Sequence, residues 1–231
     1  MCYHYNMNRK NFFFILINLF IFITTAIAVP VTLIVGSRAT RLDNLGIPYW
    51  EHIVTFTILS NIFLGLVALA AVLIAIVNFN KNRPLPKALA TWYLTAVSAG
   101  MLTFLTVILF LAPMRAIGGK NYFDMLLESM FFLHFLNPLL AALTFIFLMD
   151  GAKVQLKSRL LAVLPIIIYA IPYATCVIIL KTWPDFYGVT FGGRYYLTPL
   201  VFLVFCAVLF GISSALAWLH NKRLQKTPKI C

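Results

Sequence analysis

Six long apolar segments alternate with short polar connections along the chain. The segments cover approximately residues 12–35, 52–78, 88–113, 123–149, 158–181 and 196–219. About 20 apolar residues suffice for a helix to cross the hydrocarbon core of a bilayer. The runs are continuous and lack the alternating pattern of a membrane β-strand. The pattern therefore predicts an all-α fold, a bundle of six transmembrane helices that forms a single membrane domain over residues 1–231.

The composition agrees with this placement in a membrane. Hydrophobic residues make up 62% of the chain and charged residues 10%, and the mean hydropathy is +0.95. A soluble domain of this length needs more polar groups to cover its surface. We therefore expect a multi-pass protein of the cell membrane whose main partners are membrane lipids. Four tryptophans lie near the predicted helix ends, as in an interfacial aromatic belt: Trp50, Trp92, Trp183 and Trp218.

The distribution of basic residues predicts the orientation of the bundle. The net charge is +12. Twelve of the 18 lysines and arginines lie in the two terminal segments and in the connections 79–87 and 150–159, and six lie in the other connections. Basic residues favour the cytoplasmic side, so both termini are predicted to be cytoplasmic, as an even number of spans also requires. Topology and contact with anionic lipids explain the positive charge, and no nucleic-acid partner is expected.

The first apolar segment resembles a signal peptide at Ala26-Ile-Ala28. Its apolar run continues through Val35, beyond a normal signal core, so we expect a retained helix. Within later segments, Pro138, Pro165 and Pro172 each remove a helical hydrogen bond. Kinks in the fifth helix either open a pocket or serve packing alone. The aromatic, glycine-rich connection 183–196 is either a lid over the bundle or an interfacial loop.

The second predicted helix carries a polar stripe near its outer end. Thr57, Ser60 and Asn61 are spaced i, i+3, i+4 and share one helix face. Thr55 points about 200° away from Thr57. At 1.5 Å per residue, the stripe lies roughly 8–14 Å below the outer end of the helix. The alternative is that these side chains bond their own helix or a neighbouring helix and serve packing.

The fourth predicted helix carries the one histidine that lies far from a helix end, His134, with Asn137 on the same face. An imidazole in hydrocarbon requires a polar partner and often marks function. Counted from residue 125, His134 lies roughly 13 Å deep. The polar patches of the second and fourth helices are therefore expected to meet in the outer half of the bilayer. A structural role for His134 is the alternative.

Several chemistries lack the residues that they require. No lysine lies mid-span for a Schiff base, haem ligation usually needs paired internal histidines, and no cluster offers three or four metal ligands. We therefore expect neither a cofactor nor a metal. A hydroxyl and a histidine remain, which are the minimal nucleophile and base.

Three short motifs carry a resemblance to known membrane proteins. They are Phe56-Thr-Ile-Leu-Ser-Asn61, Leu133-His-x-x-x-Pro138 and the Trp-Pro-x-Phe-Tyr of the last outer connection. Together they resemble an uncharacterised family of prokaryotic six-helix membrane proteins. More distantly, they are similar to the androgen-induced and androgen-dependent membrane hydrolases of animals, threonine hydrolases that cleave fatty acid esters of hydroxy fatty acids.

The resemblance implies a catalytic pair. Thr57 matches the nucleophile of the animal enzymes and His134 the base, and Thr55 is a second candidate for the nucleophile. The chain departs from those enzymes in having Ser60 where they tend to have an acid, and in having one histidine in the fourth helix where they have two. Either departure is compatible with another substrate or with no hydrolase activity.

The sequence thus leaves three functions open. In a lipid-ester hydrolase, His134 would accept the proton of Thr57 as its oxygen attacks the ester carbonyl, and water would hydrolyse the acyl-enzyme. Asn61 or Asn137 would donate to the oxyanion. The alternatives are a small transporter, suggested by the kinked helices and the polar groups, and a non-enzymatic membrane scaffold.

Overall fold

The computed structural model describes residues 9–36, 49–80, 83–151, 153–185 and 187–226. This part of the chain contains six helices long and apolar enough to cross a membrane and no β-strand. They are Arg9–Ile34, Phe56–Phe79, Lys87–Ile117, Ser129–Leu148, Leu156–Ile179 and Tyr195–Gln225. The prediction of an all-α, six-helix membrane bundle is confirmed.

The first two spans are regular helices, α1 (Arg9–Ile34) and α3 (Phe56–Asn80), and a short 3₁₀ helix, η1 (Tyr49–Val54), precedes α3. The third, fourth and fifth spans each contain π-helical turns. The third comprises α4 (Lys87–Thr106), η2 (Val107–Leu111) and α5 (Ala112–Ile117). The fourth comprises α6 (Ser129–Phe131), η4 (Phe132–Leu136), α7 (Asn137–Leu143) and η5 (Thr144–Leu148).

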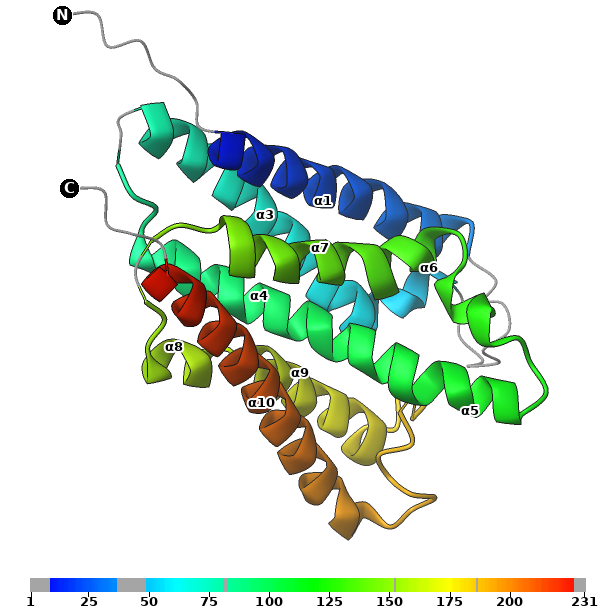
Figure 1. Cartoon of the computed structure of the whole chain (residues 1–231). Helices are drawn as coiled ribbons and strands as arrows, with labels where there is room; N and C mark the ends of the chain where they lie inside the picture. The colour runs from blue at the N-terminus through cyan, green and yellow to red at the C-terminus, as the bar shows by residue number, and fades with distance from the viewer. Residues whose placement is uncertain (1–8, 37–48, 81–82, 152, 186, 227–231) are drawn as a thin grey trace, which may run out of the picture.

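The fifth span comprises α8 (Leu156–Leu161), α9 (Leu164–Ala174) and the π-helical η6 (Thr175–Ile179). A one-turn 3₁₀ helix, η7 (Tyr195–Leu197), leads into the last span, α10 (Thr198–Lys226). Figure 1 shows α1, α3 and α7 on one side of the central helix α4, with α8, α9 and α10 on the other. The start of α1 and the end of α10 lie at the same end of the bundle (Figure 1).

We call this end the basic end, because it carries Lys10, Lys87, Lys153 and Arg223. One acid organises it: Asp150 accepts hydrogen bonds from Lys10 of α1 and from Arg223 of α10, the latter at 2.7 Å. The first and last helices are thereby joined to the end of the fourth span. Which side of the membrane the basic end faces stays a prediction of the charge pattern.

The fourth span begins later than the sequence predicts, at Ser129 rather than at residue 123. Residues Tyr122–Leu126 form a separate 3₁₀ turn, η3, whose start is capped by the Asn121 side chain. Glu128 then adopts φ 57°, a left-handed conformation that interrupts a right-handed helix. The apolar run is continuous in sequence, but the helix is interrupted at Glu128, six residues before His134.

The π-helical turns leave backbone carbonyls without a helical partner, and other side chains supply one. In η2 the N–H of Ala112 bonds the carbonyl of Val107, so the next carbonyl, Ile108, would need the N–H of residue 113, which is proline. The hydroxyl of Tyr122 donates to the Ile108 carbonyl instead, at 2.9 Å. An unpaired carbonyl in hydrocarbon is costly, so this bond stabilises the irregular turn.

Candidate functional site

His134 lies in the π-helical turn η4 and is buried, with 4% of its surface exposed. Its Nδ1 lies 2.7 Å from the backbone carbonyl of Met125 in η3. Because a carbonyl can only accept, Nδ1 carries the proton and Nε2 keeps a free lone pair. The ring is therefore oriented by the turn that precedes the break at Glu128. Its partner is a backbone carbonyl, and no sequence pattern identifies it in advance.

Asn61 brings the second span to this turn. Its Nδ2 donates to the Leu133 carbonyl at 3.0 Å and to the carbonyl of Thr57, in its own helix, at 2.8 Å. The N–H of Asn137 bonds the Phe132 carbonyl, so the Leu133 carbonyl would need the N–H of Pro138, which does not exist. Asn61 thus satisfies a carbonyl orphaned by the proline, immediately beside His134. The polar stripe of the second span thus reaches the backbone beside His134, while the side chains of His134 and Asn137 bond other groups.

Asn137 faces a different helix. Its Nδ2 donates to the Thr25 hydroxyl at 3.1 Å, and its Oδ1 accepts from the Thr24 hydroxyl at 2.8 Å, both in α1. Both N–H groups of Asn61 are likewise used by backbone carbonyls. The two amides predicted as oxyanion donors hold neighbouring backbone and side chains in this structure, and their catalytic role stays a prediction.

Thr57 is the second residue of α3 and is half-buried. No hydrogen bond connects its hydroxyl with His134 in the part of the chain that the structure describes. Thr55, the second candidate nucleophile, precedes the helix, and its hydroxyl donates to the His52 carbonyl at 2.8 Å. Ser60 is buried and bonds the Thr103 hydroxyl of α4 at 3.1 Å. The polar stripe of α3 therefore reaches two neighbours, the fourth span through Asn61 and α4 through Ser60.

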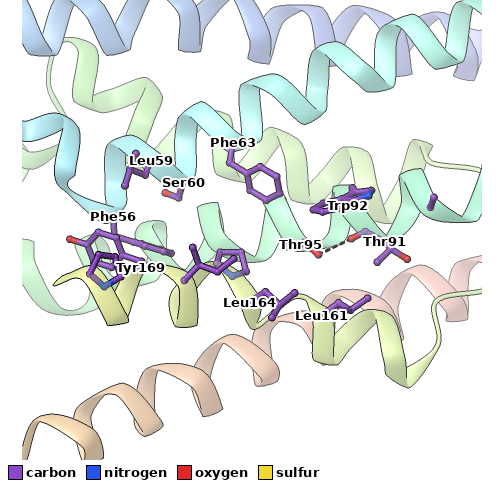
Figure 2. A pocket seen from close by; sticks show the side chains of 14 residues that line it. Phe56, Leu59, Ser60, Phe63, Thr91, Trp92, Thr95, Leu161, Leu164 and Tyr169 are labelled. Atoms are coloured by element: carbon purple, nitrogen blue, oxygen red, sulfur yellow. Dashed lines mark hydrogen bonds between the residues drawn. The ribbon is translucent and has the colours of Figure 1, made fainter. Parts of the chain in front are cut away.

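Beside this polar cluster lies an apolar groove between α3, α4 and the fifth span, with a volume of about 590 Å³ (Figure 2). The wall is mainly hydrocarbon and aromatic. Its lining residues are Phe56, Leu59, Ser60 and Phe63 of α3; Ala88, Thr91, Trp92 and Thr95 of α4; and Leu161, Leu164, Pro165, Ile168, Tyr169 and Pro172 of the fifth span. We call this cavity the groove.

The groove bears on the two interpretations of the prolines. Pro165 and Pro172 both line it, as expected if the irregular fifth helix opens a pocket rather than serving packing alone. Trp92, predicted as part of an interfacial belt, contributes its ring to the wall and packs edge-on against Phe63 at 6.2 Å. No sequence pattern marks the groove itself, because its wall is assembled from three spans.

The connection between the fifth and sixth spans anchors the end of the groove that lies away from the basic end. The backbone N–H of Phe56 donates to the Tyr187 hydroxyl at 2.9 Å, and the ring of Phe56 packs against Tyr169 at 5.4 Å. Asp185 fixes the loop, accepting bonds from Thr190 and Tyr173. The described part of this loop therefore packs against the start of α3, as a cover of the bundle would.

Hydrogen bonding also sets the ionisation of the loop carboxylate. Partial burial alone would raise the pKa of Asp185. The hydrogen bonds that its carboxylate accepts from Thr190, Tyr173 and Val189 outweigh burial and hold that pKa below its usual value. The carboxylate therefore stays charged at neutral pH and keeps the loop folded on itself.

His220, which directly follows the last predicted apolar segment, is buried as His134 and His52 are. The last helix continues to Lys226 rather than ending near residue 219. The His220 Nδ1 lies 2.9 Å from the Phe145 carbonyl of η5, and its ring stacks on that of Phe145. It closes an irregular turn, as Asn61 does in η4.

Comparisons with known proteins add no relative. No protein-family model, curated protein or solved structure matches the chain. The functional interpretation therefore depends on the groove and on the polar cluster.

Proposed function

We propose that this multi-pass membrane protein binds a lipid and holds one of its acyl chains in the groove. The observation that carries the proposal is the groove itself, an apolar cavity of about 590 Å³ in a helix bundle of membrane-spanning length. Its size falls within the range of about 300–1,000 Å³ typical of small-molecule sites.

The serine and threonine hydroxyls in the wall support a hydrocarbon ligand rather than a polar one. The Ser60 hydroxyl bonds the Thr103 side chain, and the Thr95 hydroxyl bonds the Thr91 carbonyl. The Thr91 hydroxyl in turn lies 2.8 Å from that of Ser158. These hydroxyls have protein partners, so they require none from a ligand. An apolar chain loses nothing by lying against them.

Photo-crosslinking tests this proposal. The probe is an oleoyl phosphatidylcholine with a diazirine in its acyl chain, added to the detergent-solubilised protein, with the adducts mapped by mass spectrometry. We expect saturable adducts on the groove residues of α3, α4 and α9. Leu164→Trp should reduce them severalfold, because Leu164 lines the groove and is 41% exposed.

The matched control is Ile167→Trp. Ile167 lies on the same helix and is 42% exposed, but it is not among the groove residues. It should leave the adducts unchanged. Non-saturable labelling spread evenly over the lipid-facing surface, or equal labelling of both tryptophan variants, would overturn the proposal.

A second candidate is hydrolysis of a lipid ester by Thr57 and His134. One observation favours it: the Met125 carbonyl fixes the His134 tautomer and leaves Nε2 as the acceptor that a general base needs. The motif resemblance to membrane threonine hydrolases supports the same pair. A fluorophosphonate probe on the solubilised protein should label the wild type and should fail on Thr57→Ala and His134→Ala. Equal labelling of all three proteins would remove this candidate.

A further inference from the structure

The groove leads toward a second, polar cavity at the basic end. This basic pocket has a volume of about 280 Å³ and is lined by residues of the first turn of α4 and of the segment that precedes and opens α8. Thr91 lines both cavities, and its hydroxyl is hydrogen-bonded to that of Ser158, another residue of the pocket wall. The two cavities therefore adjoin at Thr91.

The pocket has the charge that an anion requires. Lys87, at the start of α4, and Lys153, before α8, both line the pocket. The polar side chains of Gln155 and Ser158 line it as well, and no acid is among the lining residues. Asp150, the one acid at the basic end within the described residues, is engaged by Lys10 and Arg223. The two pocket lysines are thus not neutralised by that carboxylate. The positive end of the α4 dipole lies at the same place.

We infer that the joined cavities bind an anionic phospholipid, with its phosphate in the basic pocket near Lys87 and Lys153 and an acyl chain in the groove. The inference rests on the proposed binding of an acyl chain. A phosphate attached to a hydrocarbon chain matches a basic cavity that adjoins an apolar one, whereas a free anion would leave the groove unfilled. Basic residues beside a membrane surface attract anionic headgroups in the same way.

Native mass spectrometry of the full-length protein in detergent tests the headgroup. The probes are dioleoyl phosphatidylglycerol and dioleoyl phosphatidylcholine, which have identical acyl chains. We expect the wild type to bind phosphatidylglycerol on the order of tenfold more tightly. The double variant Lys87→Ala/Lys153→Ala should lose this preference and still bind both lipids at the weaker level.

The control double variant is Arg83→Ala/Lys157→Ala. It removes the same charge from exposed positions at the basic end that do not line the pocket, and it should keep the preference. The headgroup inference is overturned by equal binding of the two lipids to the wild type, or by a preference that survives loss of the pocket lysines. It is equally overturned if the control double variant loses the preference, which would indicate diffuse charge attraction.

The groove variant separates the two proposals. Leu164→Trp should weaken binding of both lipids, because it fills the space for the chain. Reduced binding of both lipids with no headgroup preference in the wild type leaves the acyl-chain proposal standing and removes the phosphate site. No effect of Leu164→Trp on either lipid overturns the acyl-chain proposal, and the headgroup inference falls with it.

Discussion

Single side chains compensate for backbone irregularities in this bundle. Tyr122, Asn61 and His220 each contact a carbonyl in a different π-helical turn, at Ile108, Leu133 and Phe145. In water such carbonyls would be hydrated, but hydrocarbon offers no substitute. Polar residues of this bundle, including the candidate catalytic residue Asn61, therefore also stabilise the fold. The contribution of each to the free energy of unfolding can be measured separately from any activity.

The pairing of Asn61 with Pro138 gives a double-mutant test. Asn61→Ala should lower the free energy of unfolding by about 1–2 kcal/mol, because the Leu133 carbonyl loses its donor. In a Pro138→Ala background residue 138 regains an N–H that can bond this carbonyl, so the cost of Asn61→Ala should shrink. Unfolding by a denaturing detergent, followed by circular dichroism, measures both values. Costs that simply add would contradict this account of Asn61.

At this scale the sequence predicted which helices carry the polar residues but only part of their contacts. Asn61 reaches the fourth span at the Leu133 carbonyl, next to His134 in the chain, but the span begins at Ser129 rather than near residue 125, from which the depth of His134 was counted. The partner of His134 was not predictable, because it depends on the left-handed Glu128 that separates η3 from the fourth helix. Burial of His220 was missed because its helix runs one to two turns farther than the hydrophobic pattern.

The helices themselves follow closely from the sequence, because a continuous apolar run of sufficient length has few alternatives in a membrane. What the hydrophobic pattern does not encode is the way in which neighbouring helices approach. α1 and α3 pack tightly at Gly65, where an added Cβ would lie 3.0 Å from Cγ2 of Thr25. Thr25 in turn accepts the hydrogen bond of Asn137.

Two glycines provide a matched test of this helix contact. Gly211→Ala in α10 should raise the free energy of unfolding by about 0.5–1 kcal/mol, because an added Cβ meets nothing within 4 Å and alanine favours the helix. Gly65→Ala should fail to give this gain and should lower stability, because the new methyl displaces Thr25. Thermal unfolding in detergent compares the two. An equal gain from both substitutions would show that α1 and α3 are not in close contact.

Asp150 joins three elements and gives the bundle a pH-dependent contact. Partial burial would raise the pKa of this carboxyl, but its hydrogen bonds with Lys10 and Arg223 outweigh burial and lower that pKa below the usual value. Since the folded pKa lies below the unfolded one, the contact stabilises the fold above about pH 4 and is lost as the pH falls through the folded pKa.

Asp150→Asn should therefore lower the unfolding temperature at neutral pH and flatten its decline between about pH 5 and about pH 3. Thermal melts of wild type and variant across this range check the change. Asp185, whose pKa is also lowered, remains in the variant and should leave part of the decline. Identical pH profiles for the two proteins would argue against the contact with Lys10 and Arg223.

For the whole molecule, the charge pattern predicts that the basic end faces the cytoplasm. A fluorescent protein fused to the C-terminus and produced in a bacterial host should fluoresce, and alkaline phosphatase fused there should be inactive. The same phosphatase inserted at Gly119, an exposed position at the opposite end, should be active. The reverse pattern of activities would place the basic end on the outer side.

The groove could not be predicted at this scale, because its wall comes from three spans whose relative tilt the hydrophobic pattern does not specify. Its most direct test is an experimental map of the detergent-purified protein with added dioleoyl phosphatidylglycerol. We expect elongated density along Ser60, Trp92 and Leu164, ending in a compact feature beside Lys87 and Lys153 (Figure 2 shows the groove). A groove closed by its own side chains, or open and without density, would contradict lipid binding.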